Sequence, residues 1–214
     1  MTGAKSEPGP ATNLSTTLWA ANADWAQRTL MHPFVRGLGD GSLPIDAFRR
    51  YVAQDAYFLE AFARAYAYCL AQSTARADLR AFADLIAGVI DELKLHADYA
   101  ERWRVDLANV TPGVATRAYT EFLIGLARLG GIGLTAAAMT PCMRLYAFLG
   151  QELAKGQVAP PYAEWVRTYA APQFETLAQT LEGLLDWHAT DTPAVRAAYR
   201  RAMELEHGFF DANL

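Results

Sequence analysis

Long segments with apolar residues at intervals of three and four dominate this 214-residue sequence. That interval gathers the apolar side chains on one face of an α-helix, and the strict alternation typical of half-buried strands is nearly absent. We therefore predict an all-α protein, folded as a single-domain helical bundle. The helices are expected at residues 15–30, 45–72, 77–104, 113–129, 132–154, 159–188 with a break at Pro172, and 192–212.

Short clusters of helix-breaking residues separate these segments. Glycine and proline gather at 37–44, 111–113, 130–131, 159–161 and 190–193, where turns are expected. Thr192 before Pro193 is a typical helix start, because proline suits the first helical position. No internal repeat or interdomain linker interrupts the pattern.

The composition indicates a soluble globular chain. Hydrophobic residues make up 52% and charged residues 20%, which suffices for a full core. The net charge is −4 with scattered basic residues, so no nucleic-acid partner is expected. The longest uncharged run, 129–143, is shorter than the roughly 18 residues that a membrane span needs, so no membrane partner is expected either. Two cysteines in a chain of this size indicate free thiols in a reducing compartment.

The first residues differ in composition from the rest of the chain. Residues 1–13 are rich in Pro, Gly, Ser and Thr and contain no apolar segment typical of a signal peptide. We expect residues 1–13 to form a disordered lead-in and residues 14–214 to form the helical domain. A cytoplasmic location is the corresponding expectation.

Three reactive side chains fall on apolar helical stripes. Asp55 lies in line with Phe58 and neighbouring apolar residues of its helix, and Glu206 lies between apolar residues of the last helix. Cys142 lies on the stripe that continues through Tyr146. An unpaired buried carboxylate costs several kcal/mol, so each needs a partner, a raised pKa or a polar cavity.

A purely structural interpretation of these residues stays open. Asp55 and Glu206 could each pair with a buried Arg, Lys or Tyr, and Cys142 could pack as a small hydrophobic residue. The tyrosines near the stripes could equally fill the core. Two inward carboxylates together with an inward thiol favour a site between helices.

Pro141 directly precedes the thiol inside an expected helix. Proline there removes a backbone donor and costs roughly 3 kcal/mol. We expect the helix to bend near residue 141 and to direct Cys142 into a cavity.

Five segments in order resemble the TenA / thiaminase II family, which adopts the heme-oxygenase-like fold. The resemblance covers nearly all of the chain from about Trp19 onward. The segments are HPFVRGLGDGSLP at 32–44, YVAQDAYFLEAFARAYA at 51–67, ELKLH at 92–96, TPCMRLYAFLG at 140–150 and ELEHGFF at 204–210. Members of this family hydrolyse 4-amino-5-aminomethyl-2-methylpyrimidine to its hydroxymethyl counterpart in thiamin salvage, and some also cleave thiamin. The resemblance implies a small-molecule aminopyrimidine substrate, no cofactor, and a homotetramer.

The resemblance also implies roles for individual residues. Cys142 matches the family's nucleophile, and Glu206 matches a glutamate used in proton transfer. Asp55 matches the aspartate that holds the aminopyrimidine edge. The residues that match the lining of the ring pocket are Tyr119, Tyr146, Tyr169 and Phe209, the last as a stacking aromatic.

Two positions place the chain within the family. Phe58 stands where several members carry a second tyrosine, which removes a hydroxyl from the implied pocket. A sister subgroup lacks the cysteine and has a glutamate where Tyr146 stands. With Cys142 and Tyr146 both present, this chain resembles the cysteine-bearing subgroup. Which of thiamin, the aminomethylpyrimidine or an N-formyl derivative is preferred stays open, as does the role of Cys69.

Two other functions remain as alternatives. Glu204 and His207 have the i, i+3 spacing of di-iron bundles, which would suit a metal- or heme-dependent oxidase, although no second Glu-x-x-His occurs. As heme ligands the other histidines are poorly placed: His32 precedes a proline in a turn, His96 is expected on a mixed face, and His188 lies at a helix end. A non-catalytic pyrimidine-binding or regulatory protein is the second alternative.

Overall fold

The structure is a computed structural model that describes residues 13–214. Most of the lead-in predicted at residues 1–13 therefore lies outside the described residues. Every regular element from residue 13 onward is helical. The helices are α1 (Leu14–Ala21), α2 (Ala23–Leu30), α3 (Pro33–Asp40), α4 (Ile45–Gln72), α5 (Arg76–Trp103), α6 (Val114–Leu129), α7 (Gly131–Ala154), a 3-10 turn (Pro160–Tyr162), α8 (Ala163–Ala170), α9 (Pro172–His188) and α10 (Pro193–Asn213).

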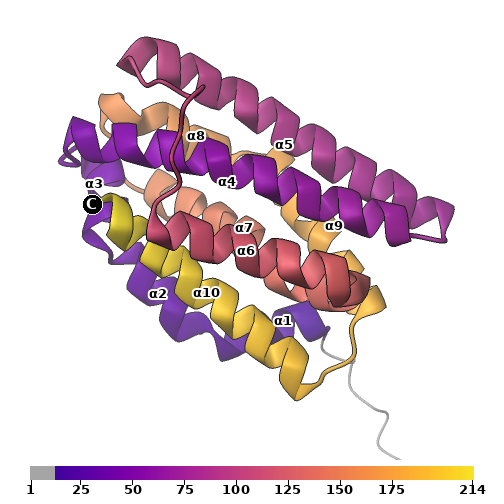
Figure 1. The fold of residues 1–214 in the computed structure, drawn as a ribbon. Helices are drawn as coiled ribbons and strands as arrows, with labels where there is room; N and C mark the ends of the chain where they lie inside the picture. The colour runs from indigo at the N-terminus through magenta and orange to yellow at the C-terminus, as the bar shows by residue number, and fades with distance from the viewer. Residues whose placement is uncertain (1–12) are drawn as a thin grey trace, which may run out of the picture.

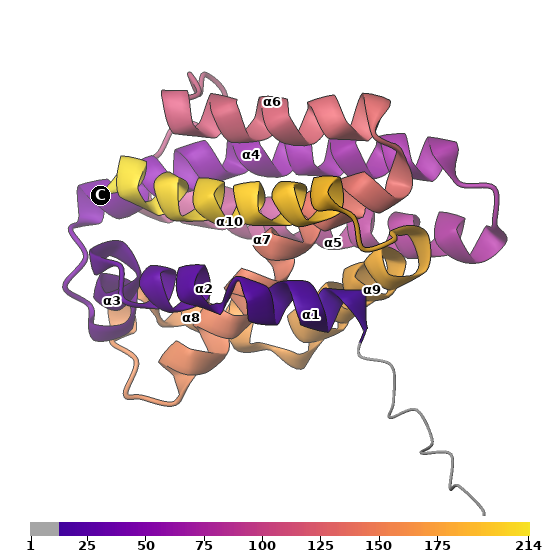
Figure 2. The same cartoon turned by 90° about the horizontal axis from the view of Figure 1, so that it is seen from below.

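The helices form a layered bundle around α7. In Figure 1, α5, α4, α6 and α10 run side by side across the front, and α7 lies behind them. Figure 2 shows α1, α2 and α3 with α8 and α9 on the opposite side of α7. Helix α7 packs against α4, α6, α8, α9 and α10. Side chains from several helices therefore meet around one central helix, which confirms the predicted all-α bundle.

Helix α7 is the most buried helix because it is apolar nearly all round. By length and composition alone it is apolar enough to cross a membrane, but 72% of that apolar window is buried inside the protein. A helix that is hydrophobic on every face belongs in a core of this kind. Pro141 lies inside the helix, and the hydroxyl of Thr140 donates a hydrogen bond to the carbonyl of Ala136 at 2.7 Å.

The prediction for residues 37–44 was partly wrong, because α3 runs through Asp40. His32 caps this helix, since its Nδ1 accepts a hydrogen bond from the Phe34 amide at 3.1 Å. Gly37 does not end the helix. Its lack of a side chain lets the backbone of Leu43 come close, since a Cβ at residue 37 would lie 2.8 Å from the Leu43 backbone nitrogen. The chain folds back over that glycine, and the Leu43 amide donates to the Gly37 carbonyl at 3.2 Å.

One further boundary differs from the prediction, and two others agree with it. The helix expected at 15–30 is interrupted at Asn22, whose side-chain amide donates to the Leu18 carbonyl at 2.8 Å. This local bond competes with a continuous helical backbone. The segment expected at 159–188 contains the predicted break: α8 ends at Ala170, and α9 begins at Pro172. Thr192 caps α10 by accepting from the Val195 amide at 3.3 Å, as the sequence predicted.

Candidate active site

Five helices direct the predicted site residues into the middle of the bundle. Helix α4 carries Asp55 and Phe58, α6 carries Tyr119, α7 carries Cys142 and Tyr146, α8 carries Tyr169, and α10 carries Glu206 and Phe209. All eight side chains are buried, the two carboxylates included. The apolar stripes therefore gave the correct inward orientation for Asp55, Cys142 and Glu206.

A closed cavity lies where α4, α5, α7 and the α8–α9 segment meet. Its volume is about 10 Å³, which holds roughly one water molecule. Five of the predicted residues line this cavity, and further residues complete it. The predicted ones are Asp55, Phe58, Cys142, Tyr146 and Tyr169, and the others are Leu59, Phe62, Glu92, Met143 and Phe174.

Cys142, Glu206 and Tyr119 form one side of the site, here called the nucleophile wall. The Tyr119 hydroxyl donates to Glu206 Oε1 at 2.6 Å. Burial raises the pKa of Glu206 to about 8, although hydrogen bonds from Tyr119 and Cys142 act to lower it. Burial also raises the pKa of the Cys142 thiol, and the neighbouring Glu206 carboxylate raises it further. At neutral pH both groups therefore hold their protons.

Asp55, His96, Glu92 and Tyr169 form the opposite side, here called the binding wall. His96 Nε2 lies 2.8 Å from Asp55 Oδ2, and its Nδ1 lies 3.0 Å from the Glu92 carbonyl. Both ring nitrogens thus face oxygens that accept hydrogen bonds, which favours the doubly protonated imidazolium. Burial acts to lower the pKa of His96, but the Asp55 carboxylate outweighs it and the net shift is upward.

Glu92 and Tyr169 pair in the same way as Glu206 and Tyr119. The Tyr169 hydroxyl donates to Glu92 Oε1 at 2.5 Å. Burial raises the pKa of Glu92 to about 7, with a further contribution from the Asp55 carboxylate, whereas His96 and Tyr169 act to lower it. Each wall therefore holds a glutamate that can carry a proton near neutral pH.

Aromatic rings connect the two walls. Phe58 lies with its ring centroid 4.7 Å from that of Tyr119 and 6.0 Å from that of Phe209. Tyr146 packs against Tyr169 at 4.8 Å. Glu206, Tyr119 and Phe209 do not themselves line the small cavity but lie directly behind Cys142 and Phe58. Because Phe58 has no hydroxyl, this part of the cavity is apolar.

Gly150 fixes the position of Tyr169. A Cβ at residue 150 would lie 2.5 Å from the Tyr169 backbone carbon and 2.6 Å from the Ala170 nitrogen. Only glycine allows α7 and α8 to approach this closely. The TPCMRLYAFLG segment therefore supplies both the thiol and the contact that positions a tyrosine opposite it.

An ion cluster holds α7 against α9 just beyond the thiol. Arg144 donates to both carboxylate oxygens of Glu182, at 2.7 Å each, and to both of Glu175, at 2.9 and 2.8 Å. Its charge is thus shared by two carboxylates from one helix. This cluster fixes the start of α9, where Phe174 lines the cavity.

Three site residues were missed from the sequence. Glu92 and His96 belong to the ELKLH segment, but His96 was expected on a mixed face and is 1% exposed. The missing signal was pairing: the inward Asp55 required a buried partner, and a histidine on a neighbouring helix could have supplied it. Phe174 gave no sequence signal. Cys69 packs in the core, where burial raises its pKa to about 11.

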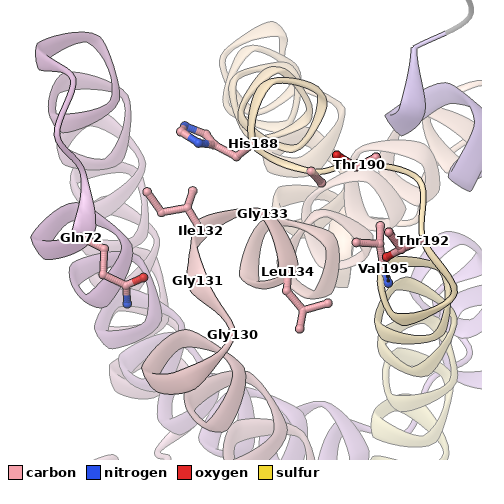
Figure 3. Close-up of a pocket in the computed structure, with 11 residues that line it drawn as sticks. Gln72, Gly130, Gly131, Ile132, Gly133, Leu134, His188, Thr190, Thr192 and Val195 are labelled. Carbon is pink, nitrogen blue, oxygen red and sulfur yellow. Dashed lines mark hydrogen bonds between the residues drawn. The ribbon is translucent and has the colours of Figure 1, made fainter.

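A larger pocket lies away from the site. Its volume is about 480 Å³, and it lies between the start of α7 and the α9–α10 connection, where it contains none of the predicted site residues (Figure 3). Within residues 13–214, no group of three or more His, Cys, Asp or Glu side chains is arranged to hold a metal ion.

Two proteins of known name are similar in sequence to this chain over most of its length. The chain is 31% identical over 193 residues to an aminopyrimidine aminohydrolase of Halalkalibacterium halodurans, covering 84% of this chain and 86% of that one. It is 34% identical over 212 residues to the mitochondrial bifunctional TH2 protein of Arabidopsis thaliana, covering 86% of this chain. The chain spans only about a third of that plant protein's length, 34%.

Solved structures agree with this. A TenA family transcription regulator from Silicibacter sp. TM1040 superposes with a TM-score of 0.87 at 26% identity, over 92% of this chain and 95% of that one. A TenA homologue from Pyrococcus furiosus has a TM-score of 0.86 at 20% identity, over 94% and 99% of the two chains, which bears on the fold alone. Residues 19–214 match the TENA/THI-4/PQQC family. The chain therefore belongs to the TENA/THI-4/PQQC family, as a TenA-type member.

Proposed function

We propose that this protein is an aminopyrimidine aminohydrolase of the thiaminase II type. It hydrolyses 4-amino-5-aminomethyl-2-methylpyrimidine to the hydroxymethylpyrimidine and ammonia. One observation carries the proposal: a buried thiol, Cys142, faces a closed cavity with a proton-holding glutamate beside it and the Asp55–His96 pair across it.

The binding wall suits the aminopyrimidine edge. Asp55, held by His96, offers carboxylate oxygens to the exocyclic amine of the ring. Tyr146 and Tyr169 supply flat walls with hydroxyl groups, which is what a planar polar ring requires. The ring is thereby held with one carbon next to the Cys142 sulfur.

The first half of the reaction is a nucleophilic addition. Glu206, as the carboxylate, takes the proton of the Cys142 thiol, and the thiolate sulfur bonds to a ring carbon. The electron pair displaced into the ring then expels the substrate's amino group, which is protonated at neutral pH, from the neighbouring methylene, so the carbon–nitrogen bond breaks and ammonia leaves with the bonding pair on its nitrogen. A thiol suits this role because it is both a strong nucleophile and a good leaving group.

The second half reverses the addition. A water oxygen bonds to the exposed methylene and gives up a proton to a carboxylate of the site. The electron pair returns to the ring, and the ring carbon–sulfur bond then breaks with its bonding pair leaving on sulfur, so that the aromatic ring is restored and Cys142 is released as the thiolate. Glu206 then returns the proton to sulfur, and a pKa near neutrality suits a group that both accepts and donates in one cycle.

We further propose a soluble, cytoplasmic homotetramer. Support comes from large apolar side chains that the single chain leaves open: Leu129 and Trp187, 92% and 80% exposed, both at the same end of the bundle. Open apolar residues of this size are typical of contact surfaces. Light scattering of the purified protein gives the subunit number directly.

The test of function is an ammonia-release assay on the aminomethylpyrimidine, run beside thiamin cleavage. We expect steady ammonia release with formation of the hydroxymethylpyrimidine. Binding of the pyrimidine without product would point instead to a non-catalytic pyrimidine-binding protein. Metal analysis of the same active sample addresses the oxidase alternative.

A further inference from the structure

A surface groove adjoins the closed cavity on the side of the binding wall. It lies between α5 and the α8–α9 segment and has a volume of about 300 Å³, the lower end of the range for small-ligand sites. Gly88, Glu92 and Leu95 line it from α5, at positions that share one helical face. Phe174 and Leu177 line it from α9.

The groove and the cavity meet at two side chains. Glu92 and Phe174 line both spaces, whereas the other pockets of comparable volume described within residues 13–214 share no residue with the cavity. The Glu92 carboxyl lies inward on Tyr169, while the rest of the residue faces the groove. The Phe174 ring packs edge-on against Tyr169 at 4.9 Å. Rotation of Phe174 would therefore join the groove to the cavity.

The cavity alone is too small for a substrate, so a bound substrate must also extend into neighbouring space. About 10 Å³ accommodates roughly a water molecule and not a pyrimidine ring. Phe174 lies on the first turn of α9, where Pro172 and Gln173 are less buried, so its ring has less packing around it than the tyrosines of the deeper wall. The Arg144 cluster fixes the helix itself. The movement is therefore expected in the side chain of Phe174.

The lining of the groove limits what it can hold. Leu95, Phe174 and Leu177 give apolar walls, and among the described residues no Lys, Arg or His side chain lines it. The charged groups in it are Asp91, which pairs with Lys94 at 2.7 Å, and Glu92 at the junction. Thr168 and Gln173 add two neutral polar side chains to the lining. A flat, largely apolar ring, neutral or cationic, fits this groove, whereas an anionic group would meet two carboxyl groups and no basic side chain from residues 13–214 to pair with.

We propose that this groove is a leaving-group subsite, which receives a flat ring attached to the exocyclic methylene of the aminopyrimidine. The proposal rests on the proposed function and extends it: with ammonia as leaving group the groove is unused, and with a heteroaromatic ring such as the thiazolium of thiamin it is filled. The carbon–nitrogen bond breaks as above, and the ring leaves into the groove with the electron pair on its nitrogen.

The test fills the groove and compares two substrates. Leu177→Trp adds bulk inside the groove, and Leu134→Trp makes the same change in the separate pocket of Figure 3. We expect Leu177→Trp to lower kcat/KM for thiamin by at least about tenfold, the size of effect that fit in an apolar pocket produces. Ammonia release from the aminomethylpyrimidine should stay within about threefold in kcat/KM, because its small leaving group makes no contact with the groove in the transition state.

Each remaining outcome has a definite meaning. Parallel loss on both substrates, or no loss on either, overturns the subsite. Wild-type protein that releases ammonia yet leaves thiamin intact also overturns the subsite but leaves the proposed function standing. Wild-type protein inactive on both overturns the proposed function itself. Gly88→Val is the second variant if Leu177→Trp fails to fold, because a side chain at residue 88 would meet Leu177 across the groove.

Discussion

Both walls of the site contain a hydrogen-bonded tyrosine–glutamate pair, but the surroundings of the two pairs differ. On each wall a tyrosine hydroxyl donates to a buried glutamate, Tyr119 to Glu206 at 2.6 Å and Tyr169 to Glu92 at 2.5 Å. Burial raises the pKa of both glutamates, to about 8 and about 7 respectively. The pair alone therefore does not define a role.

What differs is the third partner. On the nucleophile wall Glu206 neighbours a thiol, so its proton has a natural exchange partner in Cys142. On the binding wall Glu92 neighbours the Asp55–His96 pair, and His96 acts to lower the pKa of this glutamate. In the proposed reaction the nucleophile wall moves a proton to and from sulfur, and the binding wall holds a fixed arrangement of charge against the ring.

The largest expected effect on turnover is that of removing the Cys142 thiol. Cys142→Ser should abolish ammonia release, because a serine hydroxyl in this apolar setting is neither acidic enough to add to the ring nor a good leaving group. Cys69→Ser is the matched control, since that thiol is also buried but lies in the core away from the cavity. Turnover is measured together with circular dichroism. Full activity in folded Cys142→Ser protein would contradict the assignment of the nucleophile.

A second prediction compares the two glutamates directly. Glu206→Gln should lower kcat/KM by about 10²- to 10⁴-fold, the usual size of a lost acid–base group. Glu92→Gln keeps the hydrogen bond to Tyr169 and removes only the electrostatic interaction of the carboxylate with His96, so it should cost about tenfold, or about 1.4 kcal/mol. In the wild type, kcat/KM should rise with pH through about 8, since Glu206 must lose its proton before it can accept that of Cys142.

The pH profile distinguishes the walls even if the losses are similar. The rise near pH 8 should vanish in Glu206→Gln and persist in Glu92→Gln. Thiamin is the better substrate for this profile, because its leaving group has no amine that titrates. Equal losses with the rise kept in both variants would mean that Glu206 is not the base.

The sequence predicted the nucleophile wall better than the binding wall. Cys142 and Glu206 of the nucleophile wall both lie on apolar stripes of helices that face the core, so periodicity alone predicted that they point inward. On the binding wall the same signal reached only Asp55. His96 gave no such signal, because Lys94 and other polar residues surround it on α5 and make its face look mixed. Pairing between helices, such as His96 with Asp55, depends on how α4 and α5 pack, which no local pattern records.

Prediction of the fold was limited in the same way, by contacts between segments that are distant in the sequence. The long helices followed from their period, whereas α3 was missed because Gly37 was interpreted as a breaker. Its role is set by the approach of Leu43, a contact made only after the chain folds back. Phe174 was missed for a similar reason, since an aromatic residue on the first turn of α9 looks like any other until the cavity beneath it is known.

The smallest expected effect is on stability, and it follows from the raised pKa of each glutamate. A glutamate whose pKa is raised in the folded state stabilises the fold fully below its unfolded pKa near 4.5, and that contribution is lost as the pH rises to the folded pKa. Each tenfold difference in proton affinity between the folded and unfolded states corresponds to about 1.4 kcal/mol. Glu92 therefore contributes to the loss only up to about pH 7, whereas Glu206 continues to contribute up to about pH 8.

Thermal unfolding followed from about pH 5 to about pH 8.5 measures this loss as a falling Tm. Glu206→Gln should flatten the part of the curve above about pH 7, because of the two glutamates only Glu206 still gives up its proton there, and Glu92→Gln should flatten only the part below. A wild-type Tm that does not fall across this range would mean that neither glutamate keeps its proton in the folded protein at neutral pH.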